Sequence, residues 1–188
     1  MKFLKWFFIG IMAMGLLGYF VGYPYMKEKT KKHSPQQTTS YKGDGVQLAV
    51  TYSSPSKKGR AIFGNLVPYG AVWRTGANEP TTFSTNTDIQ IADQKLAKGT
   101  YSLWTIPTEE KWTIIFNREV PDWGVTFLSG GTETTRNSEK DALRCEIMPE
   151  ATKKMVERFT IEFEESPQLA MILSWEETRV RIPFNIVR

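Results

Sequence analysis

The residues of this chain best suited to chemistry lie in one stretch, residues 60–82, which reads RAIFGNLVPYGAVWRTGANEPTT. Its centre, W-R-T-G-A-N-E at residues 73–79, places a guanidinium, a carboxamide and a carboxylate beside an indole ring. Arginine binds carboxylates and phosphates through paired hydrogen bonds, and tryptophan offers a flat face to a sugar ring or an apolar ligand. The stretch is rich in glycine and proline and has no helical or strand period, which predicts irregular backbone. Irregular segments of this length inside a domain are usually functional.

Three interpretations of this stretch are open. In the first it is a structural plug, with aromatic rings filling one end of the domain and Arg74 paired with Glu79, because a buried charge needs a partner. In the second it is a ligand-binding module in which aromatic faces, an arginine fork and polar groups select a small molecule or carbohydrate. In the third, Glu79 acts with Glu176 or Asp122 as the carboxylate pair of a glycosidase-type hydrolase. The candidate binding residues are Arg60, Trp73, Arg74, Asn78, Glu79 and Trp104.

The remaining reactive residue types narrow the chemistry. The only histidine, His33, precedes the folded body, so catalysis by Ser-His-Asp or Cys-His groups and His-ligated metal sites inside the body are not expected. The only cysteine, Cys145, excludes an intramolecular disulfide. Apolar and charged residues alternate over residues 143–147, so Cys145 is predicted to face the core as a small, unreactive apolar side chain. We assign no catalytic residue, metal or cofactor, and we favour a non-enzymatic role.

The positive charge of the chain belongs to its N-terminal arm. The formal net charge is +4, but residues 1–42 hold seven lysines and one glutamate, which leaves residues 43–188 with a net charge of −2. A nucleic-acid-binding protein needs a basic face on the folded domain itself. The sequence therefore does not predict nucleic acid as a partner.

An apolar segment follows Lys2 and Lys5. Residues 6–26 contain no charged side chain, and an apolar helix of about 20 residues crosses the hydrocarbon core of a bilayer. Trp6 and Tyr23 lie near its two ends, where aromatic side chains anchor a helix at the membrane interface. We therefore predict an N-terminal membrane anchor over residues 1–26, with the lipid bilayer as a partner.

A cleaved signal peptide is the alternative to an anchor, but residues 19–23 offer no good small-x-small cleavage site. Residues 27–43 are rich in Lys, Ser, Thr and Gln, and this composition predicts a flexible basic linker. The lysines on both flanks of the apolar segment do not by themselves export the domain, because the positive-inside rule alone would leave it in the cytoplasm.

Alternating apolar and polar residues dominate the body, residues 44–188. This alternation predicts strands at residues 46–52, 81–85, 88–92, 100–106, 112–117, 142–148, 159–163, 169–175 and 179–184. One helical turn is expected at residues 150–154, an exposed loop at residues 129–140 and a solvated turn at residues 176–177. Many short strands of this kind predict an all-β fold, an antiparallel β-sandwich of jelly-roll or immunoglobulin-like type.

Motifs along the body resemble the DUF2911 family. They are Y-S-S-P-S-x-K-G-R at residues 52–60, I-F-G-x-L-V-P-Y-G-x-V-W-R-T-G-A-N-E at 62–79, G-T-Y-S-L at 99–103, W-T-I-I-F-N at 112–117, W-G at 123–124, V-E-R-F at 156–159 and W-E-x-T-R-V at 175–180. The resemblance covers about residues 46–186, and the 73–79 run is its most specific part. This chain departs at Ser54, where the family usually has arginine, so a ligand contact made by that arginine would be missing here.

Family members are commonly exported bacterial envelope proteins, so the resemblance implies an extracytoplasmic domain; it implies no reaction, ligand or cofactor. Taken together, the sequence predicts a membrane-tethered envelope β-sandwich protein, a structural or ligand-binding module built around residues 60–82. A carboxylate-based hydrolase using Glu79 is the alternative.

Overall fold

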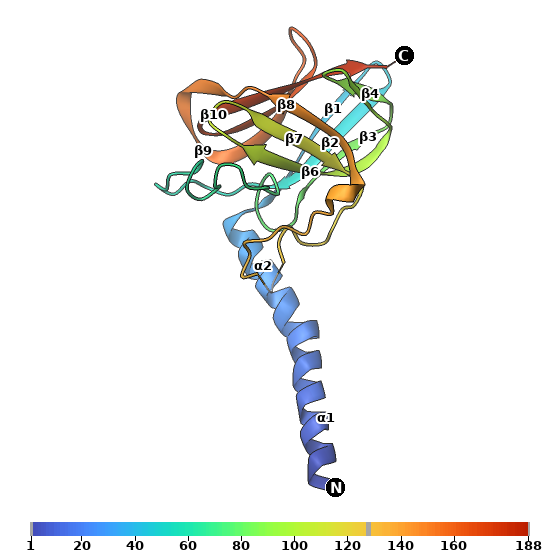
Figure 1. Ribbon diagram of the computed structural model, residues 1–188, viewed down its shortest axis with the longest axis vertical. Helices are drawn as coiled ribbons and strands as arrows, with labels where there is room; N and C mark the ends of the chain where they lie inside the picture. The colour runs from blue at the N-terminus through green and yellow to red at the C-terminus, as the bar shows by residue number, and fades with distance from the viewer. Residues whose placement is uncertain (1, 127–128, 188) are drawn as a thin grey trace. The chain divides into compact units, whose positions relative to one another are not determined.

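The computed structural model describes residues 2–126 and 129–187. The chain divides into two compact units, Met1–His33 and Ser34–Arg188 (Figure 1).

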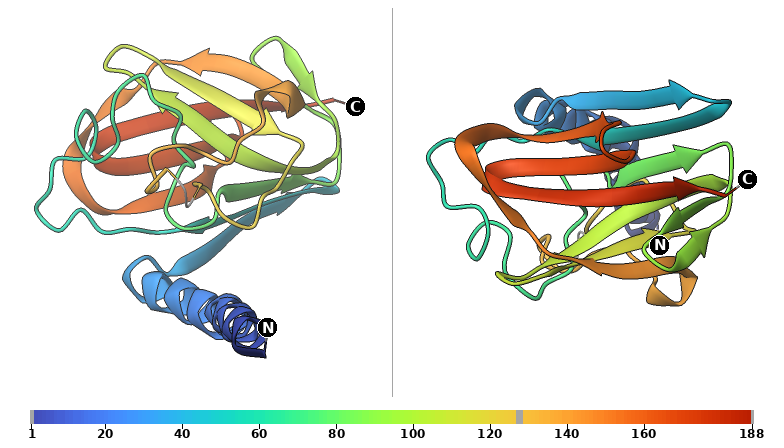
Figure 2. Two further views of the ribbon diagram at one scale, coloured as in Figure 1. Left: turned by 60° about the horizontal axis from the view of Figure 1, so that its bottom comes forward. Right: turned by 90° about the horizontal axis from the view of Figure 1, so that it is seen from above.

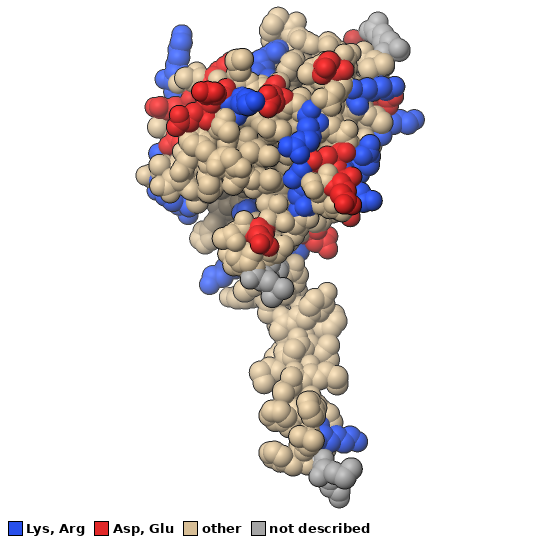
Figure 3. Space-filling view, viewed as in Figure 1, with Lys and Arg blue, Asp and Glu red and all other residues tan. Residues whose placement is uncertain are grey.

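The first unit is helical throughout its described residues. It consists of α1 (Lys2–Leu17), the π-helical turn η1 (Gly18–Gly22) and α2 (Tyr23–His33). By length and composition, the stretch Phe3–His33 is apolar enough to cross a membrane, which also fits a signal sequence. The charged residues of this segment are Lys5 and five residues between 27 and 32, and Figure 3 shows the apolar part between them as almost uncharged, whereas both signs of charge are interspersed on the body.

The second unit is a β-sandwich, as the sequence predicts. Two antiparallel sheets face each other, one with strand order β1-β2-β3-β6-β7-β8 and the other with order β5-β4-β10-β9 (Figure 2). The strands are β1 (Gln36–Gly43), β2 (Val46–Ser53), β3 (Thr81–Thr85), β4 (Ile89–Ile91), β5 (Gln94–Leu96), β6 (Gly99–Pro107), β7 (Trp112–Asn117), β8 (Asp141–Ile147), β9 (Glu150–Glu164) and β10 (Ala170–Ile186), and a short 3-10 turn, η2 (Ser138–Lys140), precedes β8.

The two sheets are joined along both edges. On one side the Gln94 side chain donates to the Arg144 carbonyl at 2.6 Å, which links β5 to β8. On the other side the segment after β2 reaches β9, since the Phe159 amide donates to the Pro55 carbonyl at 3.0 Å and the Ser54 hydroxyl to the Phe159 carbonyl at 2.8 Å. The backbone groups of Arg144, Pro55 and Phe159 at these edges therefore find partners inside the domain.

Aromatic side chains fill the space between the sheets. Phe83 of β3 packs edge-on against Phe116 of β7 at 5.1 Å between ring centroids, and lies 5.8 Å from Phe184 of β10. All three side chains are at most 2% exposed. Burying a side chain of this size stabilises the fold by roughly 1.5–3 kcal/mol.

Residues 27–43 differ from the expected flexible linker. The helix continues to His33 because lysine and glutamate are good helix formers, and it ends just before Pro35, which disfavours a helical residue before it. Gln36–Gly43 then forms β1, which pairs with β2 along its whole length through a turn at Asp44 (φ 51°) and Gly45 (φ 78°). An Asp-Gly pair is a strong hairpin signal.

Two other predictions about elements were wrong. Residues 150–154 form the start of the long edge strand β9 rather than a helical turn, and exposed charged side chains such as Lys153 and Lys154 occupy it, as is common on sheet edges. Residues 169–175 and 179–184 form one strand, β10, because Glu176 is accommodated in a bulge with φ 56° rather than in a turn.

Candidate functional site

Trp73 lies in the middle of the central stretch, and its side chain faces the core. Trp73 pairs with Thr105 of β6 through two backbone hydrogen bonds, of 2.7 Å and 2.9 Å. Its ring stacks on Trp175 with centroids 6.0 Å apart and planes at 18°, and its Nε1 donates to the Gly76 carbonyl at 3.0 Å. Only 7% of Trp73 is exposed. This indole acts as a structural plug and offers no free face to a ligand in this conformation.

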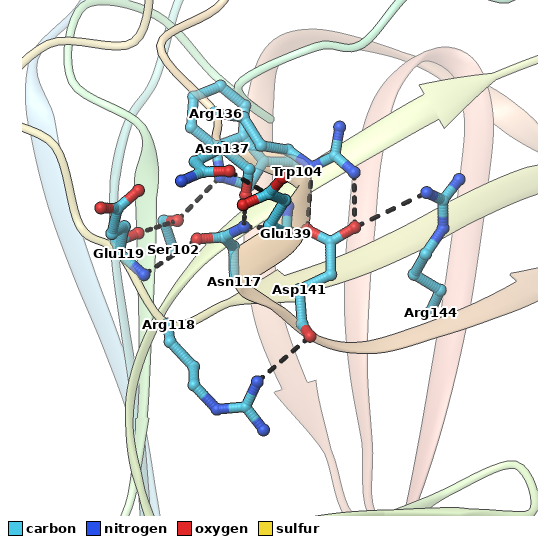
Figure 4. Close-up of polar contacts among 10 residues, drawn as sticks. All are labelled: Ser102, Trp104, Asn117, Arg118, Glu119, Arg136, Asn137, Glu139, Asp141 and Arg144. Carbon is cyan, nitrogen blue, oxygen red and sulfur yellow. Dashed lines mark hydrogen bonds and ion pairs between the residues drawn. The ribbon is translucent and has the colours of Figure 1, made fainter.

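Trp104, one residue before Thr105, points to the opposite face of the six-stranded sheet and is also fully buried. Its Nε1 donates to the Ser102 hydroxyl at 2.7 Å, and that hydroxyl donates to the Glu119 carbonyl at 2.5 Å. The outer segment, residues 118–126 and 129–140, lies on this side of the sheet, and Figure 4 shows its Arg136 and Asn137 beside Trp104. Trp104 therefore belongs to the apolar surface of the sheet that this segment covers.

Arg60 is exposed, and its guanidinium serves the local turn. Its Nε donates to the Lys57 carbonyl at 2.9 Å and its Nη2 to the Ser56 carbonyl at 2.7 Å. Among the described residues, the hydrogen bonds of Arg60 are to Lys57 and Ser56, and none joins it to Arg74 or Asn78.

Arg74 lies on the outer face with its side chain against Gly124. Extending the Trp73–Thr105 pairing by one residue sets Arg74 opposite Trp104 on this face. A β-carbon at Gly124 would lie 2.3 Å from Cδ of Arg74, so only glycine permits this approach. Desolvation by burial lowers the pKa of Arg74 below its ordinary value. Within residues 2–126 and 129–187, its buried Nε has no acceptor and its guanidinium forms no ion pair.

Asn78 provides a second donor of the same kind. Its backbone is left-handed (φ 62°), and its carbonyl accepts from the Gly124 amide at 3.0 Å. Its side-chain Nδ2 is buried and has no acceptor among the described residues. An unsatisfied buried donor costs about 1–3 kcal/mol, so two on one short turn are unusual.

The turn that carries Arg74 and Asn78 is held from several sides. The Thr81 amide donates to the Arg74 carbonyl at 3.2 Å, and the Thr81 hydroxyl donates to the Thr75 carbonyl at 2.5 Å. Gly76 has φ 147°, and a β-carbon there would lie 2.9 Å from the Ser53 carbonyl oxygen. The positions of the two donors are therefore set by the scaffold and not by mutual pairing.

The pairing of Arg74 with Glu79 considered from the sequence is not formed, since Arg74 is in no ion pair in the described part of the chain. Glu176, a possible second carboxylate for a hydrolase, accepts from the Ile62 amide at 3.3 Å and lies 3.3 Å from Nζ of Lys57. Its role in this structure is to hold the turn that begins the central stretch.

Arg136, in the same outer segment, is an arginine with a low exposed fraction that does have a carboxylate partner. It binds Asp141 through two hydrogen bonds, Nε to Oδ1 at 3.0 Å and Nη2 to Oδ2 at 2.5 Å, and the two side chains are 7% and 10% exposed (Figure 4). Asn117 also donates to Asp141 at 2.8 Å. The sequence interpretation missed this pair, because residues 129–140 have no strand or helix period.

Cys145 is buried in the core as predicted. Burial, together with the nearby Asp93 carboxylate, raises the pKa of its thiol to about 11. Within the described residues, no three His, Cys, Asp or Glu side chains are grouped so that they could hold a metal ion.

The comparisons with known proteins give a family without a function. A family model described as a protein of unknown function, DUF2911, matches residues 34–184. No curated protein and no solved structure matches the chain. The matched region spans the sandwich and includes the Arg74 turn, Gly124 and Arg136.

Proposed function

The chain belongs to the DUF2911 family, whose function is unknown, and from its own geometry we propose that it is a membrane-tethered envelope protein that binds an oxyanion, a carboxylate or phosphate, at Arg74 and Asn78. One observation carries the proposal: two buried side-chain donors on a rigid turn, Nε of Arg74 and Nδ2 of Asn78, have no acceptor among the described residues.

The chemistry of the two donors selects the ligand class. A guanidinium is always charged and presents several N–H groups in a plane, a shape that matches carboxylate and phosphate oxygens. The carboxamide adds a neutral donor, which favours an acceptor atom over a cation. A desolvated guanidinium also binds an anion more strongly than one in water, because the local dielectric is lower.

The location is part of the same proposal. The apolar helix Phe3–His33 supports a membrane tether, and the family resemblance favours an extracytoplasmic body in the cell envelope. Alkaline carbonate extraction of membranes, with determination of the N-terminal residue, tests the tether: a protein that is released, or whose N-terminus lies between residues 15 and 26, would refute it.

Thermal unfolding of the full chain in maltoside micelles tests the site. Inorganic phosphate and acetate are compared with chloride at equal ionic strength. A ligand at ten times its Kd stabilises the native state by about 1.4 kcal/mol, which raises Tm by roughly 3–6 °C for a domain of this size. We expect this rise in the native chain, a smaller one in Arg74→Lys and none in Arg74→Met.

The matched control is Arg118→Lys. Arg118 is an exposed arginine of the outer segment, and its guanidinium donates one hydrogen bond, to the Asp141 carbonyl at 3.2 Å. It should keep the full response to phosphate. An equal rise of Tm in Arg74→Met would show that the anion acts on the general surface charge, and would refute the Arg74 site.

A further inference from the structure

A groove of about 300 Å³ lies where the first half of the central stretch meets the end of the sandwich. Its walls come from four places: residues 63 and 69, the turn between β6 and β7, the turn between β8 and β9, and β10 after its bulge. None of these groups belongs to the Arg74 turn. The size is at the lower end of small-molecule pockets.

Aromatic rings form one side of this groove. Phe63 packs edge-on against Trp112 with centroids 4.9 Å apart and remains partly exposed. Tyr69 is 42% exposed. Its ring lies against Gly64 (φ 82°), where a β-carbon would be 2.8 Å from Cε2 of Tyr69, so this glycine sets where the ring lies. The groove thus presents two aromatic side chains held by the fold.

The rim of the groove is acidic. Glu109, Glu150 and Glu177 line it, and none of its described lining residues is lysine or arginine. Glu150 lies 3.1 Å from Arg179, whereas Glu109 and Glu177 form no ion pair in the described part of the chain. Desolvation raises the pKa of Tyr69, and the negative charges of Glu109 and Glu176 raise it further.

The backbone beside the groove is strained. Glu176 has φ 56°, a left-handed conformation that a glutamate seldom adopts, and the register between β9 and β10 shifts on both sides of it. The Glu176 carboxylate accepts from the Ile62 amide and forms an ion pair with Lys57, and these contacts hold the bulge. The next residues, Glu177 and Thr178, line the groove. Strained residues and bulges are common where a strand has to aim side chains at a ligand.

We propose that this groove binds a small organic cation that carries an alkylated ammonium group. The ammonium lies against the aromatic faces of Tyr69 and Phe63, which attract a cation through their π-electrons, within the field of Glu109 and Glu177. A neutral sugar would use the rings and donate hydroxyl hydrogen bonds to the carboxylates, but it would leave their negative charge unbalanced, and a metal ion would use the carboxylates but not the rings. The combination of both features favours the organic cation.

This site is independent of the proposed oxyanion site, because it uses other residues and the opposite charge. Binding of choline to the full chain in dodecyl maltoside, a detergent without amine or carboxylate, provides the test by titration calorimetry. The neutral isostere 3,3-dimethylbutan-1-ol has the same shape without the charge. We expect choline to bind about tenfold or more tightly than the isostere, with an affinity that falls as salt is raised.

Variants locate the binding. Tyr69→Leu and Glu177→Gln should each weaken choline binding by about three- to tenfold. Glu165→Gln, at the other end of the β9–β10 hairpin, is the matched control and should leave the affinity unchanged. Glu177 is exposed, so its variant keeps the fold even if Tyr69→Leu does not, and the melting temperature of each variant checks this.

Three results would overturn the proposal. No binding of choline at any attainable concentration excludes the cation. Equal affinity for the neutral isostere shows an apolar groove only. The third result is that calcium binds more tightly than choline and displaces it at low concentration. If Tyr69→Leu leaves that calcium binding intact, the groove is a carboxylate site for metal ions.

Discussion

Arg136 and Arg74 are two largely buried arginines of the outer face, and they differ in whether an acidic side chain of the described residues pairs with them. Arg136 is matched by Asp141 with two hydrogen bonds, of 3.0 Å and 2.5 Å. Arg74 packs its stem against Gly124 of the outer segment, yet its Nε has no acceptor in the described residues. Among the described residues, the cost of removing the guanidinium from water is offset by a carboxylate for Arg136 but not for Arg74. The difference suggests that one arginine stabilises the outer face, and that the other is kept for an external acceptor.

The largest effect is expected from removing the paired arginine. Arg136→Met leaves the Asp141 carboxylate buried, with Arg144 at 3.6 Å as its remaining cation, so we expect a loss of about 3–5 kcal/mol in the free energy of unfolding. Denaturant unfolding followed by tryptophan fluorescence measures it. Arg118→Met, which removes an exposed arginine, should change stability by less than about 0.5 kcal/mol. Equal midpoints for the two variants would mean that the Arg136–Asp141 pair is not structural.

The next effect concerns the close approach of Arg74 to Gly124. In Gly124→Ala the new β-carbon would lie 2.3 Å from Cδ of Arg74 and 3.0 Å from the Asn78 carbonyl oxygen, so we expect a cost of about 1–3 kcal/mol and a loss of the phosphate response. The double variant Arg74→Ala plus Gly124→Ala removes the clash with the side chain and should recover part of the stability. Additive losses in the double variant would contradict the observed contact.

Arg74→Met should not lower the free energy of unfolding, in contrast to Arg136→Met. Desolvation lowers the pKa of Arg74, which means that burial disfavours its charged form at neutral pH and that the charge reduces stability there. Replacement by an apolar chain of similar length should therefore leave the free energy of unfolding unchanged or raise it by up to about 1 kcal/mol. A loss above about 2 kcal/mol would show that Arg74 is a structural group, and the comparison with Arg136 would fail.

Cys145 is a buried ionisable group that stays neutral at pH 8. Its replacement is expected to have the smallest effect on stability of the changes considered. Its pKa of about 11 lies above the ordinary value of 9.0, so at pH 8 the thiolate fraction is roughly a hundredfold below that of an unburied thiol. The folded protein should react with a disulfide reagent at least about a hundredfold more slowly than the denatured protein. Any stability that the neutral thiol contributes is present below pH 9 and is lost as pH rises toward 11, and Cys145→Ala should flatten that loss. Rapid labelling at pH 8 would contradict the burial.

Much of the fold follows from local pattern. The strands at residues 81–85 and 112–117 have the bounds that alternation predicts, and the apolar helix follows from its composition. β1 was missed although Asp44-Gly45 marks its hairpin, because its residues are polar on both faces and its pairing depends on β2. β10 was divided in two because a bulge at Glu176 cannot be distinguished from a turn without its partner β9.

The sequence by itself determined the family, the sandwich class, the apolar helix and the inward orientation of Cys145, because these depend on composition and on the near-neighbour period of side chains. Tertiary structure decided which side chains of residues 60–82 face the core. In the folded domain Trp73 stacks on Trp175, and Arg74 packs against Gly124. Among the described residues, Asp141 pairs with Arg136 and no carboxylate pairs with Arg74. The physical reason is that burial and charge pairing depend on contacts between distant segments, which no local pattern of residue types encodes.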